Sequence, residues 1–167
     1  MLIVFSGLPG VGKTVVAREL ARQIGAVYLR IDSIEQALRD SGVVRQFLDD
    51  AGYRVGYAIA EGNLGLGRTV VADCVNPLTL TRDAWVHVAE RAGAAVVEVE
   101  IVCSDVAEHR RRVETRVGDV PGLRLPTWDE VLSREYDAWD RERIVIDTAD
   151  CSAEQCVNSI RAMLAKA

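Results

Sequence analysis

The chain has 167 residues, of which 49% are hydrophobic and 27% are charged, and its formal net charge is −5 at pH 7. This length fits one domain that buries a sizeable core. The net negative charge argues against a general nucleic-acid-binding protein, which carries a basic surface. No apolar stretch approaches the length of a membrane span, so no membrane partner is expected. None of the four cysteines forms a C-x-x-C pair, which predicts free thiols in a reducing, cytoplasmic setting.

Apolar runs and helical periodicities alternate along the chain. The expected strands are Leu2–Ser6, Val27–Ile31, Thr69–Asp73, Ala95–Val102 and Arg143–Asp147. The expected helices are Lys13–Ile24, Ser33–Asp40, Tyr53–Gly65, Leu80–Ala92, Asp105–Arg116, Trp128–Trp139 and Ala153–Lys166. Capping-box spacing opens three of them, at Ser33 with Gln36, Thr127 with Glu130 and Ser152 with Gln155. The alternation predicts an α/β fold with a five-stranded parallel sheet and helices on both faces.

A complete phosphate-binding motif, G-x-x-x-x-G-K-[ST], fills residues 7–14. It lies between the first strand and the first helix, which favours a phosphate loop over an ordinary glycine turn. Backbone N–H groups of such a loop surround a phosphate, the lysine reaches the β- and γ-phosphates, and the threonine hydroxyl holds Mg²⁺. The expected nucleotide contacts are Gly7, Leu8, Pro9, Gly10, Val11, Gly12, Lys13, Thr14 and Val15.

Two carboxylates follow strands that are expected to border this loop. Asp32 comes after the second strand and Asp73 ends the third. Because open α/β sheets bind ligands at the carboxyl ends of their strands, both are candidates for phosphoryl-transfer chemistry. One carboxylate would accept a proton from an acceptor hydroxyl, and the other would organise Mg²⁺. The simpler alternatives are that Asp32 only caps a helix and that Asp73 only meets solvent or a turn.

Arginines gather before the one long irregular stretch, Val117–Pro126. His109 is followed by three arginines up to Arg112, and Arg116 comes one helical turn later. Arginine donors in a closing loop stabilise the charge of a transferring phosphoryl group and exclude water. The alternative is a solvated helix face whose arginines pair with Glu108 and Glu114.

These motifs resemble the small P-loop kinases of the nucleoside-monophosphate-kinase-like group. Within that group the chain is similar to chloramphenicol phosphotransferase, gluconate kinase, the zeta toxins and the 5′-kinase domain of polynucleotide kinase. The resemblance rests on residues 7–14, on the segment Ile31–Leu38 around the acceptor-activating aspartate, on Val70–Asn76, which fits V-V-x-D-x-x-N, and on Cys103 followed by Arg112-x-x-x-Arg116.

The resemblance implies a three-layer P-loop NTPase fold in a single kinase domain over residues 1–167, with an arginine-bearing lid at about residues 109–127. It implies that ATP and Mg²⁺ are the cofactors. Lys13 and Thr14 then become the triphosphate and Mg²⁺ contacts, Asp32 the candidate base, and Asp73 a group that binds Mg²⁺ or the acceptor. Arg112 and Arg116 become the lid arginines.

The implied reaction transfers the γ-phosphoryl group of MgATP to a small-molecule hydroxyl or a nucleotide-type acceptor. The acceptor is expected between the helices Ser33–Asp40 and Tyr53–Gly65. Candidate lining residues are Arg39, Phe47, Tyr53, Tyr57, Asn63 and Arg82. The spacing of the two tyrosines favours core packing over a ligand platform.

Two alternatives to a metabolic or resistance kinase stay open. One is an ATP-binding switch without a small-molecule acceptor, and the other is a zeta-type toxin kinase that acts on a sugar nucleotide. A nucleic-acid partner is not expected, although 5′-OH ends stay open as acceptors. These patterns do not specify the oligomeric state.

Overall fold

The structure is a computed structural model that describes residues 1–42 and 50–165. Its elements are β1 (Leu2–Ser6), α1 (Lys13–Ile24), β2 (Val27–Arg30), α2 (Ile31–Asp40), α3 (Ala51–Gly65), β3 (Val70–Asp73), α4 (Thr79–Arg91), β4 (Val96–Val102), α5 (Val106–Thr115), α6 (Trp128–Leu132), β5 (Ile144–Asp147) and α7 (Ala153–Leu164). The capping boxes predicted at Thr127 and Ser152 are confirmed.

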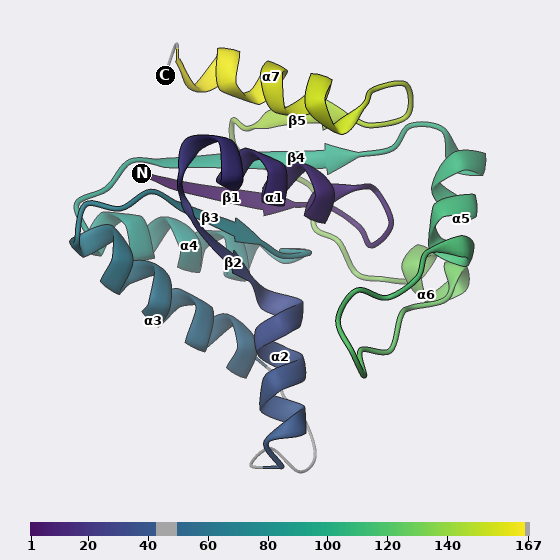
Figure 1. The fold of residues 1–167 in the computed structure, drawn as a ribbon, viewed down its shortest axis with the longest axis horizontal. Coiled ribbons are helices and arrows are strands. Elements are labelled where there is room, and N and C mark those ends of the chain that lie inside the picture. The colour runs from purple at the N-terminus through teal and green to yellow at the C-terminus, as the bar shows by residue number, and fades with distance from the viewer. Residues whose placement is uncertain (43–49, 166–167) are drawn as a thin grey trace.

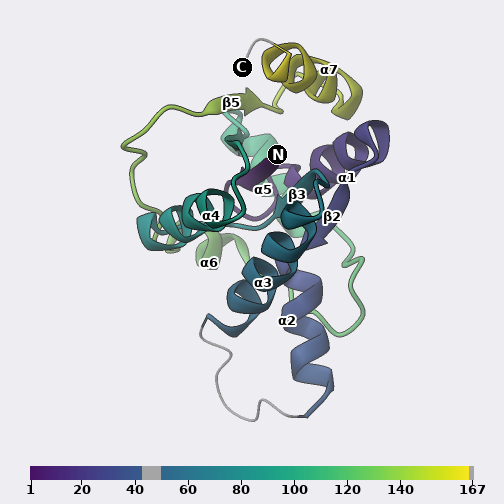
Figure 2. The same cartoon turned by 90° about the vertical axis from the view of Figure 1, so that its left-hand side faces the viewer.

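The strands form one parallel sheet in the order β2-β3-β1-β4-β5. Figure 2 shows α1 and α7 on one side of this sheet and α3 and α4 on the other. Consecutive parallel strands need a crossover, and the helices that provide it cover both faces. The predicted three-layer α/β arrangement with a five-stranded parallel sheet is confirmed.

Alternate side chains of β1 enter two different cores. Ile3 and Phe5 pack with apolar side chains of α1 and α7, whereas Leu2 and Val4 pack in the core that includes Trp85 of α4. All five residues of β1 are buried, because helices cover both faces of this central strand. The successive side chains of a strand point to opposite faces, so a continuous apolar run serves both cores.

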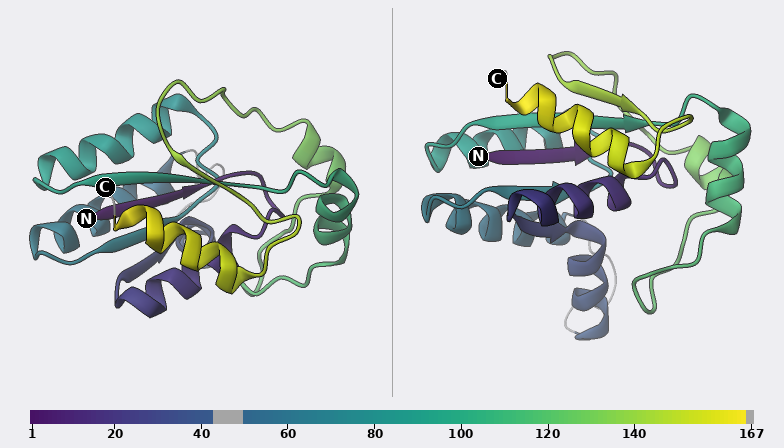
Figure 3. Two further views of the ribbon diagram at one scale, coloured as in Figure 1. Left: turned by 90° about the horizontal axis from the view of Figure 1, so that it is seen from above. Right: turned by 45° about the horizontal axis from the view of Figure 1, so that its top comes forward.

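The carboxyl ends of the parallel strands meet at one edge of the sheet. Figure 1 shows α5 and α6 standing beyond this edge, while α2 extends away from the sheet below it. The two views of Figure 3 show the segment between α5 and α6 reaching back past the strand ends toward α2. The loop after β1 therefore faces the segment that was predicted to be a lid.

α2 begins two residues before the predicted start at Ser33. The predicted capping box of Ser33 and Gln36 is wrong, because the helix starts at Ile31 and Arg30 occupies the cap position without a side-chain hydrogen bond to the helix. Asp32 consequently lies inside the first turn. There its negative charge is stabilised by the helix dipole, while its carboxylate is not used as a cap.

α6 ends at Leu132, so the predicted helix over Trp128–Trp139 is wrong in its second half. The segment after α6 instead contacts the side chain of Arg82, which is wholly buried. Its guanidinium donates to the backbone carbonyls of Asn76, Pro77, Asp137 and Ala138. It also lies 4.0 Å from the centre of the Trp139 ring. These long-range bonds hold the segment after α6 against α4, and the prediction that Arg82 lines the acceptor site is wrong because its side chain is wholly buried.

Two predicted residues, Phe47 and the helix end at Lys166, lie outside the described residues, and α7 ends at Leu164. Within the described ranges, each helix is too short or too polar to cross a lipid bilayer. The cysteines at positions 74, 103, 151 and 156 are free thiols, as the sequence predicts.

The buried contacts of Arg82 predict a large effect of the substitution Arg82→Met. Methionine keeps much of the side-chain volume but removes every donor, so buried carbonyls lose their partners and the expected loss of unfolding free energy is about 3 kcal/mol. Urea denaturation measures it. The control Arg91→Met removes an exposed arginine from the same helix and should change stability by less than about 1 kcal/mol. Equal effects of the two variants would contradict the inference that Arg82 is a buried clamp, which holds the segment after α6 against α4.

Candidate active site

The loop after β1 is packed tightly against the neighbouring elements. Gly7 and Gly10 have φ angles of 136° and 88°, which non-glycine residues rarely adopt. A Cβ atom on Gly7 would lie 2.2 Å from the carbonyl oxygen of Ile101, and one on Gly10 would lie 2.4 Å from a methyl group of Val113. The glycines therefore allow the loop to fold between β4 and α5.

His109 of α5 lies against the same loop and was missed as a site residue by the sequence reasoning. Its Nε2 atom lies 2.9 Å from the carbonyl oxygen of Pro9, and its ring meets the Trp128 ring edge-on. The histidine is buried. No sequence pattern predicts this contact, because 100 residues separate the two partners.

Lys13 opens α1 and is almost entirely buried, with 7% of its surface exposed. Its ammonium donates to the carbonyl oxygen of Leu8 at 2.9 Å. Burial lowers the pKa of Lys13, whereas the carboxylates of Asp73 and Asp32 act in the opposite direction. Both aspartates predicted as site residues are thus brought into electrostatic contact with the lysine of the phosphate loop.

The two aspartates have different surroundings. The carboxylate of Asp73 is buried and accepts a hydrogen bond of 2.7 Å from the hydroxyl of Tyr28. Burial and the charge of Asp73 raise the pKa of Tyr28, so the tyrosine remains a donor. The side chain of Asp32 is 43% exposed, and its closest charged partner is Arg30 at 3.5 Å. Of the two carboxylates, that of Asp32 is therefore the more exposed.

Asp119, a residue that the sequence reasoning also missed, ties the segment 116–127 to the sheet. Its carboxylate accepts hydrogen bonds from Arg18 at 2.7 Å and from Arg30 at 2.9 and 2.8 Å. Burial acts to raise the pKa of Asp119, but these hydrogen bonds outweigh it and hold the pKa below the ordinary value of an aspartate. The contact therefore persists at neutral pH and is lost only as the pH falls through that lowered value.

Arg116, at the start of this segment, is half-buried near Asp32 and Lys13. Burial lowers the pKa of Arg116, and the charge of Asp32 partly offsets that effect. Arg116 in turn lowers the pKa of Lys13. Its Nε atom is buried without a hydrogen-bond partner in the described part of the chain. Such an unsatisfied donor, next to a buried lysine, is suited to an anion.

The second predicted lid arginine, Arg112, lies elsewhere. Its guanidinium donates to the hydroxyl and the carbonyl oxygen of Thr148, after β5, and to Glu108. The hydroxyl of Thr148 in turn donates to the carbonyl oxygen of Val11 in the phosphate loop. Arg112 is thus fixed beside the outer part of the loop, away from the contacts of Arg116.

The neighbouring Arg110 and Arg111 are exposed and pair with Glu114 and Glu108. The structure therefore agrees with the alternative interpretation for these two residues, in which the arginines lie on a solvated helix face and pair with glutamates.

The predicted acceptor-lining residues are only partly brought together. Tyr53 and Tyr57 pack beside the second core, and the Tyr53 hydroxyl accepts a hydrogen bond from the backbone N–H of Asn76. Asn63 donates to a carbonyl of its own helix. Arg39 lies 3.5 Å from Glu35 on α2. The tyrosines are therefore core residues, as their spacing favours.

Thr14 and Asp73 are the residues that fit a divalent cation. The hydroxyl of Thr14 makes no hydrogen bond to the residues that the structure describes, so it is available as a ligand. Over the same ranges, no cluster of three or more His, Cys, Asp or Glu side chains could hold a metal ion. Mg²⁺ is usually bound by one or two protein oxygens together with substrate phosphates and water, and this pair fits that pattern.

Comparisons with known proteins agree with this geometry. A family model described as an AAA domain, AAA_33, matches residues 2–134, whereas no curated protein matches the chain. The APS kinase CysC of Mycobacterium tuberculosis, solved with AMPPNP and APS, is 20% identical over 98% of this chain and 96% of its own, with a TM-score of 0.73. A gluconokinase from Sinorhizobium meliloti 1021 is 20% identical over 98% and 91%, with a TM-score of 0.65. Kti12 of Chaetomium thermophilum, with ADP-AlF3, is 22% identical over 97% and 98%, with a TM-score of 0.69.

A glycine loop that encloses a buried lysine at the carboxyl edge of a parallel sheet defines a P-loop protein, and the fold is that of the small P-loop kinases. The chain belongs to the AAA domain family AAA_33. The predicted resemblance to the nucleoside-monophosphate-kinase-like group and the predicted P-loop NTPase fold are both confirmed.

The contacts of Asp119 predict that Asp119→Asn loosens the segment 116–127. Asparagine keeps the size of the side chain but loses the charge that pairs with two arginines. Exchange of the Leu123 amide, which donates to the carbonyl oxygen of Val120, should become about fivefold faster, which corresponds to about 1 kcal/mol of local stability. Asp129→Asn, an exposed carboxylate in the first turn of α6, is the control. Unchanged exchange in Asp119→Asn would show that these ion pairs do not hold the segment.

Proposed function

We propose that this protein is an ATP-dependent kinase, which transfers the γ-phosphoryl group of MgATP to the hydroxyl of a small molecule or to a nucleotide-type acceptor. The observation that carries the proposal is the position of Asp32. Its carboxylate is exposed and serves no capping role, yet it is close enough to Lys13 and Arg116 to affect the pKa values of both. A base placed beside the phosphate-binding lysine is what hydroxyl phosphorylation needs.

The proposed role of each residue is assigned from its contacts. Residues 7–15 would hold the triphosphate through backbone N–H groups, with Lys13 on the β- and γ-phosphates. Arg116 would meet the charge that develops on the transferred group, and Arg112 would support the nucleotide side of the loop through Thr148. Thr14 and Asp73 would hold Mg²⁺, which neutralises phosphate charge when it is bound.

In the proposed reaction, the oxygen of the acceptor hydroxyl forms a bond to the γ-phosphorus as the bond from that phosphorus to the bridging oxygen breaks. Asp32 takes the hydroxyl proton, and ADP leaves with the bridging oxygen. The segment 109–127 acts as the lid, and Asp119 holds it where Arg116 reaches the site. A closed lid excludes water, which would otherwise accept the phosphoryl group.

The whole chain of residues 1–167 would form this single kinase domain. Free thiols and the use of MgATP fit the cytoplasm as its compartment.

Asp32→Asn is the first test of the proposed function. ADP release is measured against a panel of nucleosides, nucleotides, sugars, a sugar nucleotide, hydroxylated antibiotics and 5′-OH oligonucleotides. With the acceptor that works, kcat should fall by about 10² to 10⁴, because general base catalysis is worth that much. The dissociation constant of ATP should change less than about twofold, because the proposal gives Asp32 no contact with the nucleotide.

The control for this test is Asp140→Asn, which changes a carboxylate that is 64% exposed and lies between α6 and β5. If no acceptor accelerates ADP release although ATP binds, the kinase proposal fails and the nucleotide-switch alternative gains. If an acceptor works and Asp32→Asn keeps the wild-type kcat, Asp32 is not the base.

Lys13→Ala tests the nucleotide site separately from the acceptor. For the wild type, MgATP at 100 times its dissociation constant should stabilise the fold by about 2.7 kcal/mol. The variant should lose most of this gain at the same MgATP concentration. Each protein is compared with its own nucleotide-free form, because loss of the ammonium also removes an opposite charge from the buried Asp73 and so lowers stability by itself. An unchanged nucleotide effect in thermal unfolding would exclude Lys13 as a phosphate contact.

A further inference from the structure

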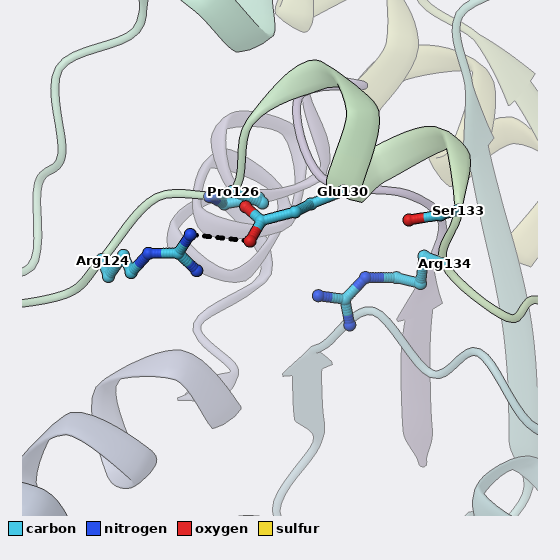
Figure 4. A pocket seen from close by; sticks show the side chains of 5 residues that line it. All are labelled: Arg124, Pro126, Glu130, Ser133 and Arg134. Atoms are coloured by element: carbon cyan, nitrogen blue, oxygen red, sulfur yellow. Dashed lines mark hydrogen bonds and ion pairs between the residues drawn. The ribbon is translucent and has the colours of Figure 1, made fainter.

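A second concave site lies under α6, separate from the phosphate loop. It is a cavity of about 310 Å³ that is lined by Arg124, Pro126, Glu130, Ser133 and Arg134. Figure 4 shows Arg124 and Arg134 entering from opposite sides, with both guanidinium groups directed into the space below the helix. Residues before and after α6 thus contribute one arginine each. A cavity of this size can hold part of a small-molecule ligand.

The charges around this cavity do not balance. Glu130 pairs with Arg124 at 2.6 Å, and the same carboxylate accepts a hydrogen bond from the backbone N–H of Thr127 in the capping box. The guanidinium of Arg134 has no hydrogen-bond or ion-pair partner within residues 1–42 and 50–165. Among the residues that line the cavity, one carboxylate faces two arginines, and the guanidinium donors of Arg134 are left for an incoming anion.

The segment that carries Arg124 lies against α2, the helix that carries the proposed base, since a Cβ atom on Gly122 would lie 2.9 Å from the Nε2 atom of Gln36. The charge of Arg134 lowers the pKa of Glu35 on α2, and the charge of Asp32 raises it, although burial of Glu35 is the largest influence. Glu35 is consequently within electrostatic reach of both residues. An anionic group held between the two arginines would therefore lie on the side of the segment 116–134 that packs against the helix of Asp32.

We propose that this cavity binds an anionic group of the phosphoryl acceptor, a carboxylate, sulfate or phosphate, so that the acceptor is an anionic small molecule. The proposal rests on the kinase function proposed above. Arg134 is the principal contact, because its guanidinium offers a free planar set of donors that matches two oxygens of such a group. Arg124 supplies the second contact and is oriented by Glu130.

The test uses pairs of compounds that differ only in the anionic group. Each pair joins a nucleoside with its 5′-monophosphate, or a sugar with its sugar acid or sugar phosphate. Binding is measured by calorimetry with Mg²⁺ and AMPPNP present, and phosphoryl transfer from MgATP is measured in parallel. At least one anionic member should bind about tenfold or more tightly than its neutral partner.

Arg134→Gln should remove this preference, and Arg134→Lys should restore part of it. Where turnover is seen, Arg134→Gln should raise KM for the acceptor about tenfold, while kcat and KM for ATP stay near their wild-type values. Arg91→Gln is the matched control, because Arg91 is a similarly exposed arginine, paired with Glu61 of α3.

The proposal is overturned if the anionic members bind no better than their neutral partners, or if Arg134→Gln has no larger effect than Arg91→Gln. These results can be told apart from failure of the kinase function. Turnover with neutral acceptors alone leaves the kinase in place and removes the anion site. Preferential binding of anions without any ADP release keeps the anion site and removes the kinase.

Discussion

The buried ammonium of Lys13 is the interaction on which the arrangement of the site depends. Burial of a charge is costly unless opposite charges and hydrogen bonds compensate for it. Here the carboxylates of Asp73 and Asp32 and the carbonyl oxygen of Leu8 provide that compensation. The ends of β3 and β2 must therefore lie beside the loop after β1. The strand order β2-β3-β1 satisfies this requirement, because it places all three carboxyl ends next to one another.

The arginines of this chain have different structural roles, and the sequence alone does not distinguish them. Arg82 is a buried structural clamp, and Arg112 fixes the junction between α5, Thr148 and the phosphate loop. The guanidinium of Arg30 forms ion pairs with the carboxylates of Asp32, Asp73 and Asp119. Arg110 and its neighbour only pair with glutamates at the surface. Function depends on which partners each side chain has, and the density of positive charge along the sequence does not reveal them.

A single stretch of chain, residues 116–134, connects the proposed chemistry with the proposed choice of acceptor. It begins with Arg116 near Lys13, is tied to the sheet through Asp119, and ends with Arg134 at the cavity under α6. Because the clamp of Arg82 holds the segment that follows, both ends of this stretch are anchored to the core. The same stretch therefore borders both the phosphate site and the cavity under α6.

The sequence by itself determined the strands, the order of strands and helices along the chain, and the phosphate loop. These features depend on contacts close in sequence: the apolar runs, the glycine pattern of residues 7–14 and the capping boxes at Thr127 and Ser152. Only the tertiary structure decided the end of α6, the role of Arg82 and the contacts of Asp119. Asp119 bonds to Arg18 and Arg30 across 101 and 89 residues, and Arg82 reaches carbonyls 55 and 56 residues away. Local periodicity carries no information about such partners, because they become neighbours only when the helices and connecting segments pack around the sheet.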